Sequence, residues 1–201
     1  MKQRLLLALL MLLTSAGFMK AQTIDISVPK GEGSTTVTIS SDEFSFNTGN
    51  YPTYSANEAV THTFGTKSVV YTIKQDKDTP VEFKIKTDAN PWGNLSIKLN
   101  GKISSFVANG ETPLSKLVKS LEFENNGELE TLRLGDTQRR FNYFPNLATL
   151  NVSGNKLKYI PFKIDTNSEN KEMTITNYTV GKQTPAVSLA GLIGNAKDGL
   201  Q

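Results

Sequence analysis

The residue types that most often carry out catalysis are scarce in this chain of 201 residues, which has one histidine, His62, and no cysteine. The lack of cysteine excludes disulfides, thiolate metal ligands and cysteine nucleophiles. One histidine leaves a transition-metal site almost without ligands. The sequence has no Gly-x-Ser-x-Gly, no phosphate-binding loop and no Gly-x-Gly-x-x-Gly that opens a helix. We therefore predict a chain that is not an enzyme and holds no cofactor or metal.

Two acidic segments, Asp76-Lys77-Asp78 and Asp88-Ala89-Asn90, carry oxygen atoms that could bind calcium. Neither is followed by the glycine and distal glutamate of an EF-hand. The simpler interpretation is a pair of turns whose acidic side chains are solvated. The carboxylate pair of a glycosidase is defined by a separation in three dimensions, so a small secreted hydrolase stays open as a less favoured hypothesis.

Aromatic residues give two candidate contact positions. Trp92 lies in a turn, where it either contacts a sugar or a protein or packs over the end of a sheet domain, and we favour packing. Tyr51, Tyr54 and Phe64 flank His62 and form a weaker candidate patch. A lone histidine is usually an ordinary surface residue.

The N-terminus has the three parts of a secretory signal peptide. Lys2 and Arg4 precede the apolar run Leu5–Leu13, and Ala21 ends a segment rich in small residues. The apolar run is too short for a permanent membrane span. We predict that residues 1–21 are removed after export through the Sec pathway. The mature chain would be periplasmic, attached to the cell surface or extracellular, with no transmembrane segment.

The charge of the predicted mature chain argues against nucleic acid as a partner. The leader contains Lys2, Arg4 and Lys20 and no acid, so its removal leaves 19 basic residues against the 19 acidic ones. A neutral chain offers no general attraction to phosphates. With 37% hydrophobic and 20% charged residues, the composition is that of an ordinary globular protein.

Residues 22–105 are predicted to form an antiparallel β-sandwich-like domain. Apolar and polar residues alternate in several short segments, as in half-buried strands. The segments are Ile24–Val28, Val37–Ile39, Phe44–Phe46, Val69–Ile73, Val81–Ile85 and Leu95–Leu99. Asn100-Gly101 predicts a two-residue hairpin turn, and residues 50–62, which show no period, predict a loop.

Residues 106–178 contain an internal repeat. The first unit, Leu121-x-Phe123-x-x-Asn126, aligns on the second, Leu150-x-Val152-x-x-Asn155, with an offset of 29 residues. Leu132 lies in the continuation of the first unit and aligns on Ile160, and residues 173–177 are a possible third strand. A period of this length is typical of leucine-rich repeats.

The spacing has a physical reason. The leucines of each short strand point into a coil, and coils must stack because one coil cannot bury its own leucines. The amide of the asparagine can pair with backbone groups that would otherwise be buried without a partner. The structural repeat positions are therefore Leu121, Asn126, Leu132, Leu150 and Asn155.

These units resemble leucine-rich repeat proteins, most closely the secreted ones of Bacteroides-type bacteria. Asn155-Lys-Leu157-Lys-Tyr-Ile160-Pro161 is similar to the general N-x-L-x-x-I-P signature of the family. The resemblance implies a short leucine-rich repeat solenoid over residues 106–178, followed by a C-terminal tail of residues 179–201. It further implies a surface or secreted protein engaged in adhesion or protein binding.

The residues between the inward leucines point outward and form the candidate binding surface. They are Glu122, Glu124, Arg133, Asn151 and Ser153, which a solenoid would place in neighbouring rows. The first hypothesis is a non-catalytic protein-binding or adhesion protein whose partner is a host or envelope protein. The alternative is a structural or accessory component of the cell envelope, and a solvated face without a ligand is equally compatible with these positions.

Overall fold

The computed structural model describes residues 22–86, 92–136, 141–157, 177–179 and 183. The predicted signal peptide, the acidic turn at Asp88–Asn90, residues 160–162 of the second repeat unit and most of the predicted C-terminal tail lie outside the described residues. Within the described ranges, no helix is long and apolar enough to cross a membrane.

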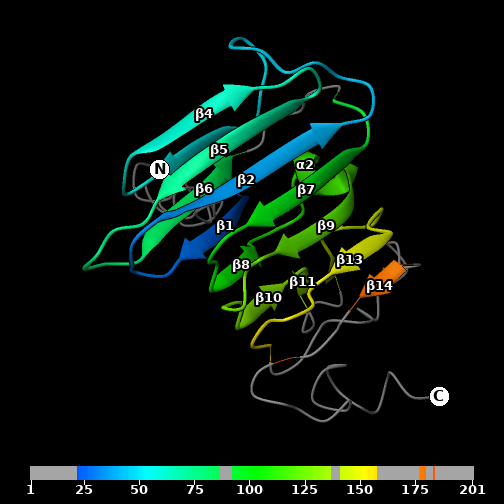
Figure 1. The fold of residues 1–201 in the computed structure, drawn as a ribbon. Coiled ribbons are helices and arrows are strands. Elements are labelled where there is room, and N and C mark those ends of the chain that lie inside the picture. Colours follow the sequence, from blue (N-terminus) through cyan, green and yellow to red (C-terminus); the bar gives the residue numbers. More distant parts are fainter. Residues whose placement is uncertain (1–21, 87–91, 137–140, 158–176, 180–182, 184–201) are drawn as a thin grey trace, which may run out of the picture.

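The protein is mainly β, and its strands form two large mixed sheets (Figure 1). The five-stranded sheet has the order β10 (Thr131–Arg133), β8 (Ser105–Ala108), β1 (Thr23–Val28), β6 (Val81–Lys86) and β3 (Thr53–Ala56). The seven-stranded sheet has the order β14 (Asn177–Thr179), β13 (Thr149–Asn151), β9 (Val118–Glu124), β7 (Leu95–Asn100), β2 (Ser34–Ser41), β5 (Ser68–Lys74) and β4 (Val60–Phe64). A short pair, β11 (Gly135–Asp136) and β12 (Phe141–Asn142), and one short helix, α2 (Pro113–Leu117), complete the described elements.

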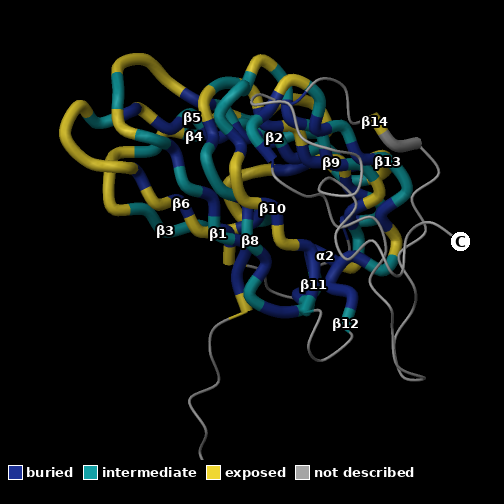
Figure 2. The backbone as a smooth tube through the Cα atoms, turned by 90° about the horizontal axis from the view of Figure 1, so that it is seen from below, coloured by how far each residue is buried: buried dark blue, intermediate teal, exposed yellow. Residues whose placement is uncertain are grey.

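Period-two alternation decides which face of each strand is buried. In β6 the side chains of Val81, Phe83 and Ile85 are fully buried, whereas those of Glu82 and Lys84 are exposed. β7 shows the same strict alternation. The buried residues of the strands lie between the two sheets, and the exposed residues lie on the outside and in the connections (Figure 2).

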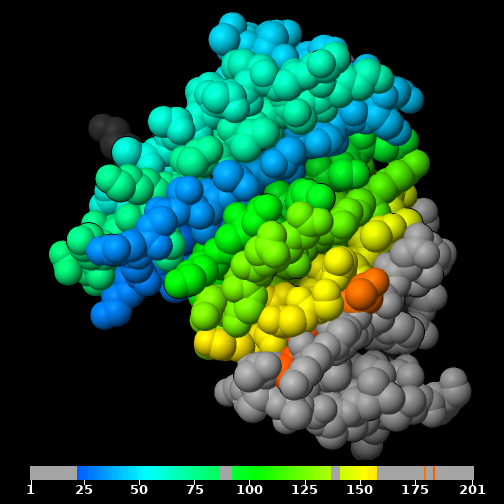
Figure 3. Space-filling model, in the orientation of Figure 1, coloured from blue at the N-terminus to red at the C-terminus, as the bar shows by residue number. Residues whose placement is uncertain are grey.

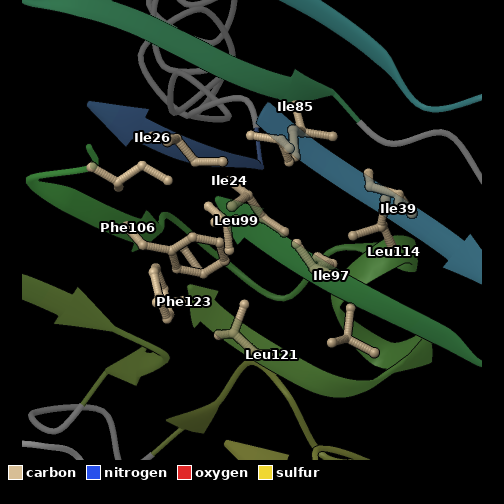
Figure 4. Packing of buried hydrophobic residues seen from close by; sticks show 14 of the residues in the cluster. Ile24, Ile26, Ile39, Ile85, Ile97, Leu99, Phe106, Leu114, Leu121 and Phe123 are labelled. Atoms are coloured by element: carbon tan, nitrogen blue, oxygen red, sulfur yellow. The ribbon is translucent and has the colours of Figure 1, made fainter. Parts of the chain in front are cut away.

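One hydrophobic cluster joins the two sheets. Figure 4 shows Ile24 and Phe106 of the five-stranded sheet close to Leu99 and Phe123 of the seven-stranded sheet. Phe106 of β8 meets Phe123 edge to face, with 5.7 Å between ring centres. Each fully buried side chain of this size contributes about 1.5–3 kcal/mol to folding, so the cluster stabilises both sheets together.

The seven-stranded sheet changes from antiparallel to parallel pairing at β7. β2 runs antiparallel to both β5 and β7. β7 then runs parallel to β9, β9 to β13 and β13 to β14. From β7 to β10, successive strands belong alternately to the seven-stranded and the five-stranded sheet (Figure 1). As a result, β9 runs parallel to β7, and β10 runs parallel to β8.

The register of the parallel strands agrees with the sequence repeat. Leu150 of β13 lies beside Leu121 of β9, which is the offset of 29 residues between the two units. Tyr178 of β14 lies beside Leu150, an offset of 28 residues. On the other sheet, Leu132 of β10 lies beside Phe106 of β8 in a parallel pair.

The hairpin predicted at Asn100-Gly101 is wrong. β7 belongs to the seven-stranded sheet and β8 to the five-stranded one, so the chain crosses between sheets here. Gly101 has a φ of +111°, and its N–H donates to the carbonyl of Glu124, 3.2 Å away. A turn dipeptide shows that the chain changes direction but not whether the flanking strands pair. The predicted domain boundary between residues 105 and 106 lies within β8.

Two further sequence expectations differ from the structure. Residues 50–62 were expected to form a loop, but they contain β3 and the beginning of β4. Both are edge strands without a fully buried residue, and β4 alternates only between half-buried and exposed positions. Phe44–Phe46, expected as a strand, forms none, and its rings instead pack with each other, 5.4 Å between centres.

Candidate binding surface

The outer face of the parallel strands carries a row of polar side chains. The register aligns Lys98 of β7 with Glu122 of β9, Glu122 with Asn151 of β13, and Asn151 with Thr179 of β14. Lys98 and Thr179 are exposed, and Glu122 and Asn151 are half-buried. Figure 3 shows β7, β9 and β13 side by side on this face of the molecule. We call these four residues the polar row.

Hydrogen bonds hold the charged members of this surface in place. The Lys98 ammonium lies 2.8 Å from the carboxylate of Glu124, and this contact raises the pKa of Lys98. The hydroxyl of Ser120 donates to the carboxylate of Glu122 at 3.0 Å. Glu124, which lies outside the polar row, is paired with Lys98. Glu122 is therefore the acidic member of the row, and it lies beside Asn151.

Asn151 and Ser153 form a local polar turn at the end of β13. The side-chain oxygen of Asn151 accepts hydrogen bonds from the N–H of Ser153 at 3.1 Å and from its hydroxyl at 2.8 Å. The side-chain oxygen of Asn151 is therefore engaged within this turn. Ser153 supports Asn151 rather than extending the row across the strands.

Arg133 does not lie with the other predicted residues. It is on β10, in the five-stranded sheet, whereas Glu122, Glu124 and Asn151 are in the seven-stranded sheet. Its guanidinium donates to the carbonyl of Gly135 at 3.2 Å and lies 3.9 Å from the carboxylate of Asp136. The expectation that all five residues form neighbouring rows is thus wrong for Arg133. Alternation in a strand predicts an outward side chain, but not the sheet to which the strand belongs.

Side-chain amides link the connections that follow the parallel strands. The oxygen of Asn126 accepts from the N–H of Ile103 at 2.7 Å, and the oxygen of Asn155 accepts from the N–H of Leu129 at 3.2 Å. Both predicted asparagines therefore pair with backbone groups of the preceding segment. We call these residues, together with Gln183 described next, the amide ladder.

The third member of the amide ladder, Gln183, was not predicted from the sequence. The buried side chain of Gln183 accepts from the N–H of Leu157 at 3.1 Å and donates to the carbonyl of Val152 at 2.9 Å. The signal was present, since Gln183 follows Tyr178 by the same five residues that separate Leu150 from Asn155. Glutamine in place of asparagine obscured it.

The two asparagines differ in how completely they are paired. The amide nitrogen of Asn155 donates to the carbonyls of Val152 and Ser153, at 2.9 and 3.2 Å. The amide nitrogen of Asn126 is buried and has no partner among the described residues. Asn155 is fully buried and Asn126 half-buried. The amide ladder therefore holds more tightly at Asn155.

A second surface feature is the aromatic cluster around His62 at the opposite end of the seven-stranded sheet. The ring of Tyr51 stacks on His62, with 4.8 Å between centres, and meets Phe64 edge-on at 5.4 Å. Tyr54 contacts the buried ring of Tyr71 at 5.3 Å. The rings of Tyr51, Tyr54, His62 and Phe64 are half-buried, and the patch suggested by the sequence is thus brought together in space.

The remaining candidates have structural partners. Trp92 is 1% exposed, packs with Phe46 and donates from its indole N–H to Asn50 at 2.8 Å, so the packing interpretation is confirmed. Asp76 accepts from the N–H groups of Thr79 and Asp78, which lowers its pKa and forms an ordinary turn. This turn borders an open hollow of about 530 Å³. The described part of the chain contains no group of acidic or histidine side chains that could hold a metal ion.

Comparison with protein-family models, with curated proteins and with solved structures gives no match for this chain.

Proposed function

We propose that this chain is an exported, non-catalytic protein-binding or adhesion protein. Its parallel strands would be leucine-rich repeat coils, and its ligand would bind the polar row. The observation that carries the proposal is the register that places Lys98, Glu122, Asn151 and Thr179 side by side on four neighbouring strands. The export step rests on the signal-peptide pattern of residues 1–21.

The form of this surface favours a protein as the partner. The opposite side of the same strands carries fully buried side chains such as Ile97, Leu121 and Leu150, so the outer side chains stand on a packed base. Small molecules usually bind in concave, mostly apolar pockets. A row of mixed charge and amide groups on a sheet instead suits a partner that offers complementary polar groups over a broad area.

The proposal is tested with purified residues 22–201 and a panel of host matrix proteins and envelope proteins. The test variant is Glu122→Lys with Asn151→Lys, which removes the acidic charge of the polar row and makes the row strongly positive. The matched control is Glu130→Lys with Thr131→Lys, which makes the same change of charge at two exposed positions at the beginning of β10 on the other sheet. We expect the test variant to lose at least about tenfold in affinity and the control to bind as the parent does.

Equal binding by both variants would exclude the polar row as the binding surface. Retention of the native chain in a membrane-associated complex, with no soluble ligand in the panel, would favour the structural role in the cell envelope instead. Turnover on a glycoside or peptide panel would contradict the non-catalytic assignment.

A further inference from the structure

Among the residues that the structure describes, β4 is the last strand of the seven-stranded sheet and pairs only with β5 (Figure 1). A strand in this position presents unpaired backbone N–H and C=O groups along its outer edge. Such an edge can take up another strand in the extended conformation. Whether β4 is open to such an addition depends on its hydrogen-bond pattern, its composition and its surroundings.

The hydrogen-bond pattern shows which groups of β4 face outward. The turn between β4 and β5 is closed by the N–H of Gly65, which donates to the carbonyl of Ser68 at 2.8 Å. Bonded and non-bonded pairs alternate in an antiparallel ladder, so Thr63 and Thr61 exchange hydrogen bonds with β5. The backbone groups of His62 and Phe64 then point away from β5, where no further strand of the described residues lies.

The contact of Tyr54 supports this assignment. Its hydroxyl donates to the carbonyl of Val60 at 3.0 Å, which requires the Val60 carbonyl to be available away from β5. Val60, His62 and Phe64 are alternate residues, so their backbone groups share one direction. Tyr54 therefore occupies the outward carbonyl of Val60, and it leaves the outward backbone groups of His62 and Phe64 open to another strand.

β4 also lacks the usual features that protect an edge strand. Proteins commonly block such edges with lysine, proline or a bulge. The sequence Val60-Thr-His-Thr-Phe64 has no proline, no glycine and no lysine, arginine or carboxylate, and its register with β5 is continuous. The edge at β10, by contrast, carries Arg133.

The surroundings of the edge define the side chains that an added strand would need. His62 and Phe64 are half-buried and lie against the half-buried ring of Tyr51, whereas Thr61 and Thr63 are exposed. Residues of an added strand on the side of His62 and Phe64 would meet these aromatic rings. Residues on the other side would lie beside the threonine hydroxyls in water.

We propose that the edge of β4 binds an extended peptide segment of another protein as an additional strand. Its backbone would pair with His62 and Phe64, and its side chains would alternate between apolar residues, packed on Tyr51, and polar residues beside Thr61 and Thr63. This site lies at the opposite end of the sheet from the polar row and is independent of it.

The test measures hydrogen exchange of single backbone amides in residues 22–201, alone and with a probe peptide. The probe is a peptide of about seven residues in which valine alternates with threonine, with lysines at both ends, matching the usual length of a strand. We expect the amides of His62 and Phe64 to exchange fast in the free chain and those of Thr61 and Thr63 slowly. Saturating probe should slow His62 and Phe64 by at least about tenfold.

Two variant pairs separate backbone pairing from ring packing. His62→Pro removes an outward N–H without removing a bond to β5, and His62→Val keeps it. We expect His62→Pro to lose at least about tenfold in probe affinity relative to His62→Val. Because proline also restricts the backbone, Tyr51→Ala serves as a second variant, with Phe141→Ala, another half-buried ring, as its control. Tyr51→Ala should weaken binding, and Phe141→Ala should not.

Protection of His62 and Phe64 in the free chain at every concentration would overturn the proposal, because the edge would then be covered. Protection that rises with chain concentration alone would show that a second copy is the occupant, which also overturns it. Equal slowing by a peptide of the same composition without alternation would contradict the predicted packing on the rings.

Discussion

The strands on the two sides of β7 belong to one sheet but are held by different means. On the side of β2, β5 and β4, neighbouring strands run antiparallel, and a tight hairpin joins β4 to β5. On the side of β9, β13 and β14, parallel neighbours are linked through side-chain amides. Asn126, Asn155 and Gln183 each accept an N–H from the segment that precedes them.

The difference shows what parallel stacking requires. Antiparallel strands can be joined by tight turns in which backbone groups pair with each other, whereas parallel strands need long connections whose backbone groups lie at the edges of the stack. A buried N–H without a partner costs about 1–3 kcal/mol, so each connection needs an acceptor at a fixed place. The amide ladder supplies that acceptor for the connections after β7, β9 and β13.

The largest effect is expected where the two regions meet. Ile97 is fully buried, lies on β7 and has Ile39 of β2 on one side and Leu121 of β9 on the other. Ile97→Ala should lower the free energy of unfolding by about 3–4 kcal/mol, because it leaves a cavity shared by both regions. Urea unfolding measures this, with the exposed neighbour Ser96→Ala as control. A loss below about 1 kcal/mol would contradict a common core.

The amide ladder itself is examined by two equivalent substitutions. Asn155→Asp removes two hydrogen bonds that the amide nitrogen of this fully buried residue donates. Asn126→Asp removes no such bond, because the amide nitrogen of Asn126 has no acceptor among the described residues. Asn155→Asp should therefore destabilise the chain by at least about 2 kcal/mol more than Asn126→Asp. Thermal and urea unfolding of the two variants give the comparison. Equal losses would mean that the donated bonds of Asn155 contribute little.

Alkaline pH should act through the antiparallel region. Burial raises the pKa of the Tyr71 phenol far above its ordinary value of 10.0, and Tyr51 and Tyr54 add to this effect. The Tyr71 hydroxyl donates to the carbonyl of Pro52. The neutral phenol is thus favoured by folding, so its contribution to stability is complete below pH 10 and falls above it.

We expect the unfolding free energy to decline by up to about 1.4 kcal/mol per pH unit above pH 10 from this residue. Tyr71→Phe is less stable at neutral pH but should show a shallower decline. Measurements of the unfolding free energy of both chains between neutral and alkaline pH give the two declines. Parallel curves would exclude Tyr71 as the cause.

The smallest effect is expected for the ion pair of the outer face. The Lys98 side chain is 47% exposed and that of Glu124 36% exposed, so water and salt screen their attraction. Lys98→Met should change the unfolding free energy by less than about 1 kcal/mol. If this substitution abolishes ligand binding while stability stays the same, the polar row is a binding surface. A large loss of stability would instead make Lys98 a structural residue.

The local pattern of the sequence predicted the strands and their buried faces well. The alternation in Val81–Ile85 and Leu95–Leu99 depends only on which residues are apolar, and β6 and β7 follow it. The asparagines at 126 and 155 were also predicted to pair with backbone groups, because their spacing repeats. These features depend on residues close together in the chain or on an exact repeat.

The pairing of strands could not be predicted in the same way. Asn100-Gly101 fits a hairpin as well as a crossover, and Arg133 points outward on either sheet. The packing of Phe106 of β8 against Phe123, which joins the two sheets, involves residues whose own segments carry no signal of their partner. The aromatic cluster depends on β3 and β4, which are short edge strands without a fully buried residue.

The most direct test of the account is the hydrogen exchange rate of the Leu129 backbone amide, which lies outside the strands and donates to Asn155. We expect this amide to be protected in the parent chain about as well as the amides of β9. We expect Asn155→Leu to remove this protection, while the amides of β2 and β5 keep theirs under conditions where the variant is folded. Fast exchange of Leu129 in the parent, or protection that survives Asn155→Leu, would contradict the claim that the amide ladder holds the parallel strands and the polar row they carry.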